Sequence, residues 1–269
     1  MTSSIKFKNE EAALFYEILR ESKSQILRFL KDKKVVGTNP HGEATRFFDK
    51  AIESTIISKL RKKGFEGTII GEELGEFRCK DRGLVYIDPL DGSLNLVRGI
   101  DFYCLSLAYA AGPNIKELKV GFIWDIPRDT IYFAERDHGA FKLKDKKIVR
   151  LVAPQEVDEI IIDVGFTTNE HCLREIRSRG TLRRMGSIAL SAAFVADGRF
   201  DGVFDMGDLK VTDAIAAYLI VKEAGGYAFL STSDISRNSR VKFIAARNKA
   251  LFDWLLELYN RHIKVLTNE

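Results

Sequence analysis

Cysteine is scarce in this sequence, and the three cysteines present lie far apart without a CxxC spacing. They are Cys79, Cys104 and Cys172. An odd number at such distances argues against a disulfide framework and against a cysteine zinc site, and it fits a reducing compartment. The N-terminus has no apolar signal core, and no apolar run approaches the roughly 18 residues that a membrane-spanning helix needs. We therefore expect a cytoplasmic protein without a membrane partner.

The sequence also lacks an excess of one charge. It carries 42 basic and 38 acidic residues among 269, for a formal net charge of +4, and the two signs are interspersed. Nucleic-acid-binding chains usually show basic clusters with interleaved aromatic residues, so no nucleic-acid partner is expected. The four histidines lack metal-ligand spacing; they are His41, His138, His171 and His262. With 45% hydrophobic residues, the chain is long enough for one large globular domain or two smaller ones.

Two stretches near the N-terminus have the three- and four-residue apolar spacing of amphipathic helices. They run from Glu10 to about Lys31 and from about Thr45 to Lys63. Between them, the stretch from Val35 to Gly42 is rich in turn formers and predicts a loop.

Beyond residue 64 the pattern changes to short apolar runs bounded by turn residues, which are typical of strands. The predicted strands are Thr68–Ile70, Leu84–Ile87, Cys104–Ala110, Val120–Trp124, Thr130–Ala134, Ile160–Val164 and Lys242–Ala245. The predicted helices of the second half are Ser187–Ala196, Val211–Ala224 and Asn248–Asn260. Their alternation with strands favours an α/β layer arrangement. The charge density near residues 142–147 predicts an N-terminal α+β half, 1–143, and a C-terminal α/β half, 144–269.

The strongest local signal is an apolar strand that ends abruptly in two carboxylates, Asp88 and Asp91, within Val85-Tyr86-Ile87-Asp88-Pro89-Leu90-Asp91-Gly92-Ser93. Helix capping explains it without any function, with Asp88 as the N-cap and Asp91 in the first turn. A functional interpretation adds that Gly92 and Ser93 present backbone N–H groups to an anion at a helix start. Carboxylates for a cation then lie beside donors for a phosphate, the pairing that metal-assisted phosphoryl transfer requires.

Two further segments carry acids where a strand ends or a helix begins. The run Thr68-Ile69-Ile70-Gly71-Glu72-Glu73 ends a strand with an acidic pair, and Val211-Thr212-Asp213 opens a helix that closes at Gly225-Gly226. Solvent exposure of the acidic pair and simple N-capping by Thr212 or Asp213 explain each segment taken separately. Strand ends are nevertheless where α/β folds gather functional groups.

Taken together, these segments resemble the inositol monophosphatase family of lithium-sensitive, magnesium-dependent sugar phosphatases. The family's Gly-Glu-Glu segment is similar to residues 71–73, and its Asp-Pro-Ile/Leu-Asp-Gly-Thr/Ser segment is similar to residues 88–93. Its Asp-Ala-Ala…Glu-Ala-Gly-Gly helix is similar to residues 213–226, and its substrate-side helix to residues 185–201. The resemblance extends from about Thr45 to Gly226 and includes archaeal dual inositol monophosphatase/fructose-1,6-bisphosphatases. It implies a layered αβαβα sugar-phosphatase-like fold and a homodimer.

The resemblance implies a metal site made of acids. One ion would be held by Glu72, Asp88 and the Leu90 carbonyl. A second ion would be held by Asp88, Asp91 and Asp213. Some members place a third, weakly held ion near Glu72. Close carboxylates repel by roughly 4 kcal/mol a pair at an effective dielectric near 20, so they need cations to stay ionised together. Oxygen-only ligands favour Mg²⁺, with Mn²⁺ as a substitute.

The resemblance also implies hydrolysis by a metal-activated water without a covalent phosphoenzyme. Glu72 and Ser93 would orient that water, with Asp49 behind them. Taken alone, Asp49 is interpreted as an exposed helical acid. Residues 35–43 would form a flexible flap whose position depends on metal occupancy.

Contacts to the phosphate and the substrate are implied for Gly92, Ser93, Gly186, Ser187, Ile188 and Asp205.

Two departures from the family pattern affect specificity. Thr212 stands where many members have tryptophan, and Asp205 is shorter than the glutamate of inositol-specific members and has an added residue before Asp213. Arg183, Arg184 and Lys210 would then hold a second phosphate, although surface solvation is the simpler explanation of the arginine pair.

We therefore expect a magnesium-dependent phosphatase that acts on a small phosphorylated sugar or polyol: inositol 1-phosphate, fructose 1,6-bisphosphate or both. A 3′-phosphoadenosine or NADP phosphatase is the alternative within the same family. A non-catalytic binding or regulatory subunit is the alternative from another class. The expected mark of such a subunit is the loss of a metal ligand, and no ligand of the pattern is lost in this sequence.

Overall fold

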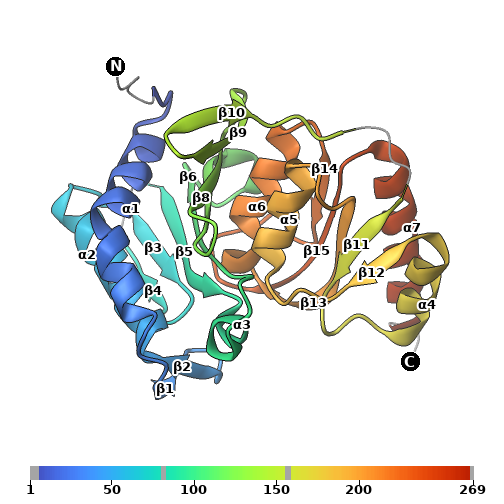
Figure 1. Ribbon diagram of the computed structural model, residues 1–269, viewed down its shortest axis with the longest axis horizontal. Helices are drawn as coiled ribbons and strands as arrows, with labels where there is room; N and C mark the ends of the chain where they lie inside the picture. The colour runs from blue at the N-terminus through green and yellow to red at the C-terminus, as the bar shows by residue number, and fades with distance from the viewer. Residues whose placement is uncertain (1–5, 80–82, 155–158, 267–269) are drawn as a thin grey trace.

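The computed structural model describes residues 6–79, 83–154 and 159–266 (Figure 1). Its helices are α1 Glu10–Phe29, α2 Phe47–Lys62, α3 Ser93–Arg98, α4 Glu170–Arg179, α5 Ile188–Ala196, α6 Val211–Glu223 and α7 Lys249–Leu266. The strands of the first half are β1 Val35–Thr38, β2 Ala44–Arg46, β3 Thr68–Gly71, β4 Glu76–Phe77, β5 Leu84–Asp91, β6 Cys104–Ala110, β7 Leu118–Asp125, β8 Thr130–Glu135, β9 Gly139–Lys144 and β10 Lys147–Arg150. Those of the second half are β11 Ile161–Val164, β12 Thr181–Arg183, β13 Gly202–Lys210, β14 Tyr227–Leu230 and β15 Arg240–Ala246.

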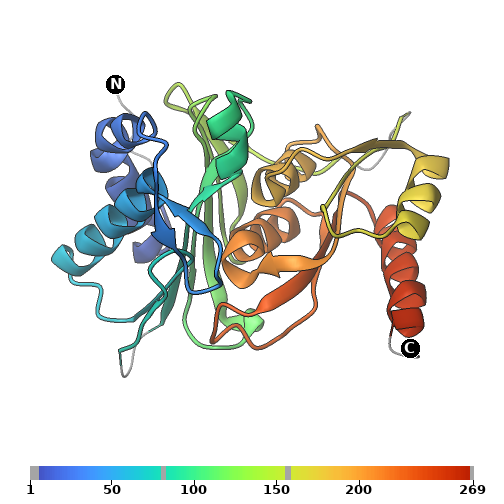
Figure 2. The ribbon, with the colours of Figure 1, turned by 90° about the horizontal axis from the view of Figure 1, so that it is seen from below.

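An eight-stranded sheet forms the larger of the two main sheets, in the order β10-β9-β8-β7-β6-β5-β3-β4. Its neighbours are antiparallel except β3 and β5, which run parallel. Helices α1 and α2 lie side by side over one face of this sheet (Figure 2). The buried side chains of α1, among them Phe15, Ile18 and Ile26, recur at the predicted three- and four-residue steps.

The second main sheet has five strands in the order β12-β11-β13-β15-β14. Helices α5 and α6 lie between the two sheets, and α4 and α7 cover the outer face of the second one (Figures 1 and 2). The layers therefore run helix, sheet, helix, sheet, helix. The expected layered αβαβα fold is confirmed.

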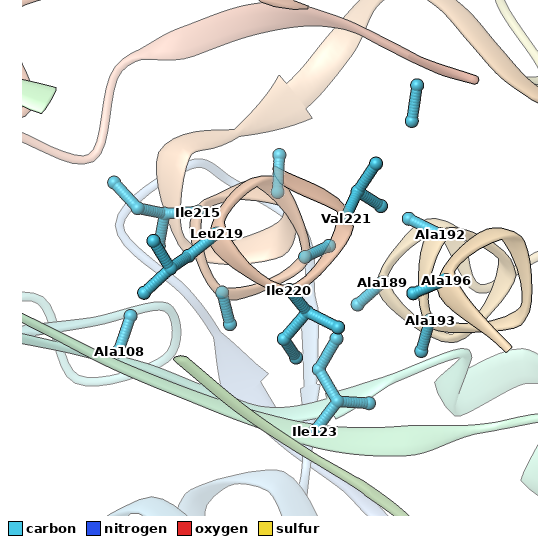
Figure 3. Close-up of a cluster of buried hydrophobic side chains, with 14 of the residues drawn as sticks. Ala108, Ile123, Ala189, Ala192, Ala193, Ala196, Ile215, Leu219, Ile220 and Val221 are labelled. Atoms are coloured by element: carbon cyan, nitrogen blue, oxygen red, sulfur yellow. The ribbon is translucent and has the colours of Figure 1, made fainter. Parts of the chain in front are cut away.

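The central helix layer is apolar around its whole circumference because it faces a sheet on either side. Helix α5 buries every one of its nine residues, and its alanines, including Ala189 and Ala193, allow α6 to approach closely (Figure 3). Helix α6 in turn approaches strand β7 at Gly121. A Cβ atom added there would lie 2.7 Å from the Ala216 carbonyl oxygen, so only glycine fits. This contact fixes α6, which carries Asp213, against the first sheet.

The segment Val35 to Gly42 is not simply a loop, and that prediction was wrong. Strand β1 pairs antiparallel with β2, and residues 39–42 form the turn of the hairpin. All four residues of β1 are exposed, so the hairpin shows no buried alternation that a sequence pattern could reveal. The Asn39 side chain instead organises the turn, since its Oδ1 accepts from the backbone N–H groups of His41 and Glu43. Helix α2 consequently begins at Phe47 and not at Thr45.

The predicted division of the chain at residue 143 remains a prediction, and strand β9 crosses it. The five-stranded sheet begins only at Ile161. None of the helices in residues 6–79, 83–154 and 159–266 combines the length and the apolar character needed to cross a membrane.

Candidate metal centre

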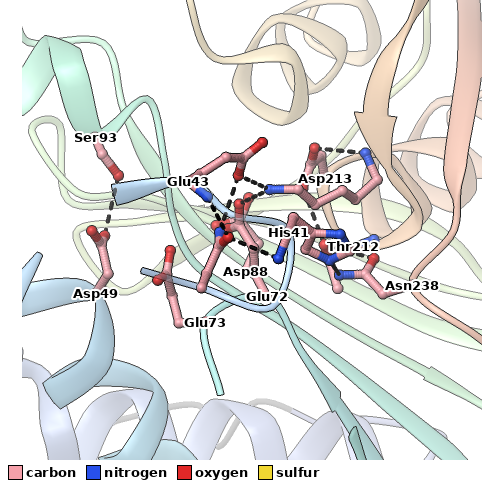
Figure 4. A network of polar contacts seen from close by, with 12 residues as sticks. His41, Glu43, Asp49, Glu72, Glu73, Asp88, Ser93, Thr212, Asp213 and Asn238 are labelled. Carbon is pink, nitrogen blue, oxygen red and sulfur yellow. Dashed lines mark hydrogen bonds and ion pairs between the residues drawn. The ribbon is translucent and has the colours of Figure 1, made fainter. Parts of the chain in front are cut away.

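Three acids from separate parts of the chain meet between the two halves of the fold (Figure 4). Glu72 follows strand β3, Asp88 lies in strand β5, and Asp213 is the third residue of helix α6. One carboxylate oxygen from each lies within 4.8 Å of the others. The parallel pairing of β3 with β5 brings the first two together, because Gly71 pairs with Ile87. The predicted convergence of Asp213 on the strand acids is therefore present in the fold.

The corner that carries Asp88 and Asp91 is a bulge at the end of β5. Asp88 pairs with Ser106 and Asp91 with Cys104, so the register shifts between the two acids. Asp88 is 1% exposed, and its Oδ1 accepts from the backbone N–H of Leu90 at 2.9 Å. The capping explanation of this motif was wrong, because Asp88 lies inside a strand and helix α3 is preceded by Gly92 with φ +94°.

Asp91 links the first sheet to the central helix layer. Its Oδ2 accepts from the Ser187 hydroxyl at 2.8 Å and from the Ala189 backbone N–H at 2.7 Å. Ser187 precedes the first residue of α5, so the carboxylate satisfies donors at the start of that helix. Asp91 is absent from the trio of acids that meet, and its predicted role as a ligand of a second ion remains a prediction.

The position of Asp213 is fixed by its own helix start. Asp213 Oδ2 accepts from the Lys210 backbone N–H at 2.8 Å, and Oδ1 accepts from the Thr212 hydroxyl at 3.1 Å. The Thr212 backbone N–H donates to Asn238 Oδ1, also at 3.1 Å. Thr212 thus holds the carboxylate by a hydrogen bond. Asp213 is not the plain N-cap of the simpler explanation, since Lys210 occupies that position.

Ser93 and Asp49 also lie together, as expected from the resemblance (Figure 4). The Ser93 hydroxyl is 3.1 Å from Asp49 Oδ1 and 2.9 Å from the Leu90 carbonyl oxygen. Asp49 is 2% exposed, so its interpretation as an exposed helical acid was wrong. The periodicity of α2 places this acid on the buried face, where the apolar neighbours Phe48 and Ile52 dominate the pattern.

Glu53 is a buried acid that the sequence analysis missed. It is 0% exposed, and its carboxylate accepts from the backbone N–H groups of Glu73 at 2.9 Å and Leu74 at 2.8 Å. These bonds hold the turn that directly follows Glu72. Gly71 leaves room for the carboxylate, because an added Cβ atom would lie 1.9 Å from Glu53 Oε1. The only signal for Glu53 in the sequence was its spacing of four residues from Asp49 on the same helix, and such pairs of acids are common.

The three carboxylates of the trio repel one another, and the Lys210 ammonium at Glu72 offsets only part of that repulsion. Burial raises the pKa of Asp88 and of Asp213 well above the ordinary range, and the carboxylate of Glu72 raises both further. Burial also raises the pKa of Asp91 to about 7, although its bonds from Ser187 and Ala189 oppose this. A divalent cation stabilises the ionised forms and accepts oxygen ligands. The donor set therefore fits Mg²⁺ or Mn²⁺.

A cavity of about 210 Å³ adjoins Asp91 on the side of the second sheet. Its lining includes Gly186, Ile188 and Asp205, three of the predicted substrate contacts. It also includes the turn of residues 165–167 after β11. The Gly207 backbone N–H donates to Asp205 Oδ1, and β13 shifts register between Asp205 and Leu209. Three of the predicted substrate contacts thus share one cavity with Asp91.

The three basic residues predicted to hold a second phosphate do not gather in this way. Arg183 donates to the neighbouring Leu182 carbonyl, and Arg184 to the Thr168 carbonyl, with both side chains at the surface. Lys210 is 3% exposed, and its ammonium lies between two carboxylates. A second phosphate at these residues remains a prediction.

Comparison with known families accounts for this arrangement of acids. A sequence model of the inositol monophosphatase family matches residues 1–264. The chain belongs to the inositol monophosphatase family. This family consists of metal-dependent phosphatases that use Mg²⁺ and bind phosphorylated sugars or polyols. The oxygen donors of the acidic trio are compatible with a family that uses Mg²⁺.

Individual members of the inositol monophosphatase family resemble the chain over most of its length. Fructose-1,6-bisphosphatase/inositol-1-monophosphatase of Thermococcus kodakarensis is 31% identical over 250 residues, 88% of this chain and 93% of that protein. Nus factor SuhB of Escherichia coli K12 is 35% identical over 189 residues, 66% of this chain and 68% of that protein. A crystal structure of an inositol monophosphatase–fructose 1,6-bisphosphatase is 27% identical, with a TM-score of 0.78 over 94% of this chain and 100% of its own. The Thermotoga maritima IMPase, 22% identical with a TM-score of 0.77 over 95% and 99%, has the same fold.

The buried acids of this family member predict how its stability responds to pH when divalent ions are removed. The pKa of Asp49 rises from 3.8 to about 8 and that of Glu53 from 4.5 to about 8, in both cases chiefly through burial. An acid whose pKa is raised by folding stabilises the fold fully below its unfolded pKa, and this contribution is lost as pH rises through the folded pKa. Thermal melts in chelator should therefore show Tm falling between about pH 5 and pH 8.

Magnesium should reverse this trend, because its ligands must be ionised before they bind the ion. The rise in Tm on adding Mg²⁺ should be larger at about pH 8 than at about pH 5. Potassium chloride at equal ionic strength serves as the control. A magnesium effect of the same size at both pH values would contradict the prediction.

Proposed function

We propose that this chain is a magnesium-dependent phosphomonoester hydrolase that acts on inositol 1-phosphate, fructose 1,6-bisphosphate or both. The observation that carries the proposal is the meeting of Glu72, Asp88 and Asp213 within 4.8 Å, with Asp88 buried and the three acids contributed by both halves of the fold. Such a cluster is costly without a cation and is well matched to Mg²⁺.

The trio and the Leu90 carbonyl would hold the ions, with Asp91 as the additional acid of a second one. When bound, magnesium supplies a Lewis acid that lowers the pKa of a water molecule and neutralises charge on the phosphate. Glu72 has a side chain that is 16% exposed, so an incoming water can reach it and donate a hydrogen bond to it. The Ser93 hydroxyl lies within donor distance of Asp49 and of the Leu90 carbonyl, so its oxygen would remain available to accept from such a water.

The cavity next to Asp91 would receive the part of the substrate beyond the phosphate. Asp205 is 3% exposed and lines this cavity, so its carboxylate is placed to accept a hydrogen bond from a sugar or polyol hydroxyl. Ile188 and the exposed Phe166 give the cavity an apolar wall, which suits the carbon face of a ring. The dual name of the Thermococcus kodakarensis relative supports a substrate range of this kind.

Parallel hydrolysis assays test the proposal. We expect Mg²⁺-dependent phosphate release with the highest kcat/KM for inositol 1-phosphate or fructose 1,6-bisphosphate, because the cavity is small and lined by Asp205. 3′-Phosphoadenosine 5′-phosphate and NADP are the comparison substrates, and a chelator is the control. A preference for either nucleotide would favour the alternative within the family.

A non-catalytic binding subunit is the second candidate, and one observation favours it. The E. coli relative, 35% identical over 66% of this chain, is named as a Nus factor. The retention of Glu72, Asp88, Asp91 and Asp213 favours the enzyme. Mg²⁺ binding without phosphate release from any of the four substrates would support the subunit.

A further inference from the structure

Lys210 places a buried ammonium group against the acidic trio. The residue is 3% exposed, and its Nζ lies 2.7 Å from Glu72 Oε1 and 2.5 Å from Glu43 Oε2 (Figure 4). A buried charge is tolerated only when it is paired and hydrogen-bonded. Both contacts pair the lysine ammonium with a carboxylate, so Lys210 brings a cation of the chain itself into the site.

The second partner of this lysine comes from the β1–β2 hairpin. Glu43 follows the turn of the hairpin, and its Oε2 also accepts from Asn39 Nδ2 at 3.0 Å. The same Asn39 holds the turn through its backbone contacts. The orientation of Glu43 toward Lys210 is thus built into the turn. Arg240, 3.6 Å from Glu43 Oε1, adds a weaker contact at the surface.

The space between Glu43 and Glu72 has the character of a cation position. Two carboxylates approach it from different elements, and both contact the same Nζ atom. Without a positive charge there, the two acids would repel. Lys210 bonds to Glu72 Oε1, and a carboxylate has a second oxygen that can accept another partner.

We propose that Lys210 fills the cation position between Glu43 and Glu72, so that no divalent ion binds there and the β1–β2 hairpin is held on the site without one. The inference rests on the proposed function, because it concerns which positions around Glu72 bind a metal ion. Lys210 is a positioning residue: its backbone N–H holds Asp213, and its ammonium holds Glu72 and the hairpin. A cation tethered to the chain is present at every metal concentration, unlike an ion in solution.

Counting bound Mn²⁺ by electron paramagnetic resonance tests the first part. Lys210→Met removes the charge and keeps most of the volume, whereas Lys210→Arg keeps the charge. We expect Lys210→Met to bind one Mn²⁺ more per chain than the wild type and Lys210→Arg to bind the same number. Adding Glu43→Gln to Lys210→Met should remove the extra ion. Equal counts in the wild type and Lys210→Met would overturn the proposal.

Hydrogen exchange of residues 35–46 tests the second part. In chelator, these amides should exchange about 10-fold faster in Lys210→Met than in the wild type, because a charged hydrogen bond to the hairpin is lost. Added Mn²⁺ should restore protection in Lys210→Met but not in the double variant. Glu43→Gln alone should speed exchange and leave the Mn²⁺ count unchanged, which keeps the test valid if Lys210→Met folds poorly. Identical exchange in the wild type, Lys210→Met and Glu43→Gln would overturn this part.

The failure of the inference can be told apart from failure of the proposed function. A wild type that releases no phosphate or binds no Mn²⁺ overturns the proposed function, whatever Lys210 does. A wild type that binds Mn²⁺ and hydrolyses phosphate, with an unchanged count in Lys210→Met, overturns only the role of Lys210.

Discussion

Replacing Asp213 with asparagine should lower magnesium-dependent phosphate release by at least about 100-fold, since loss of even an outer partner of a metal ligand costs about 10- to 100-fold. Asp213 is the member of the trio that comes from the C-terminal half of the chain. Asparagine retains an oxygen for the Lys210 backbone N–H but loses the negative charge that attracts the ion. Phosphate release and Mn²⁺ affinity, measured on the same samples, check this result.

The fold of the Asp213→Asn variant should survive. Burial and Glu72 raise the pKa of Asp213, so removing its charge relieves repulsion, and the variant in chelator should melt no lower than the wild type in chelator. Asp253→Asn, an exposed position on α7 that pairs with Lys249, is the matched control and should leave phosphate release unchanged. Undiminished hydrolysis by Asp213→Asn would rule out the metal assignment.

Replacing Gly71 with alanine should weaken divalent-ion binding by about 10- to 100-fold. The new Cβ atom would lie 1.9 Å from Glu53 Oε1, so the buried carboxylate has to leave the backbone N–H groups of Glu73 and Leu74. The turn that orients Glu72 then loses its support. Overpacking of this kind also costs about 1–3 kcal/mol of stability. Calorimetric titration with Mn²⁺ and urea unfolding measure the two effects.

Gly37→Ala provides the matched control for this glycine substitution. Gly37 lies in the exposed strand β1, and an added Cβ atom there meets nothing within 4 Å. We expect its ion affinity and free energy of unfolding to match those of the wild type. If Gly71→Ala behaved like Gly37→Ala, the support of Glu72 by Glu53 would be disproved.

Elements that bury one face in a regular pattern were predictable from the sequence. Helix α1 is an example, and strand β6, which is buried on both faces, was predictable from its continuous apolar run. Helix α4 escaped prediction because only three of its ten residues, with Cys172 among them, are buried. Strand β13 escaped because its register shift around Gly207 interrupts the alternation. Exposure and irregular backbone therefore limited the prediction of the fold.

The candidate site was predictable where its residues form local motifs. Asp88 of the motif in residues 88–93 meets Glu72 and Asp213, as the resemblance implies. The contributions of Glu53 and Glu43 were not predictable, because each acts through partners more than 20 residues away or across two sheets. A lone acid on a helix or in a turn is usually a solvated side chain, so only the folded arrangement distinguishes these two.

The close contact between strand β7 and helix α6 ties the position of Asp213 to Gly121, a residue that contributes no acid to the site. Gly121 has no side chain, so the Ala216 carbonyl rests almost on the strand, and the depth of Asp213 in the molecule depends on that spacing. Efforts to engineer a different metal preference must therefore preserve the helix-to-strand separation as well as the ligands. Any side chain at position 121 would have to push α6, and Asp213 with it, away from the first sheet.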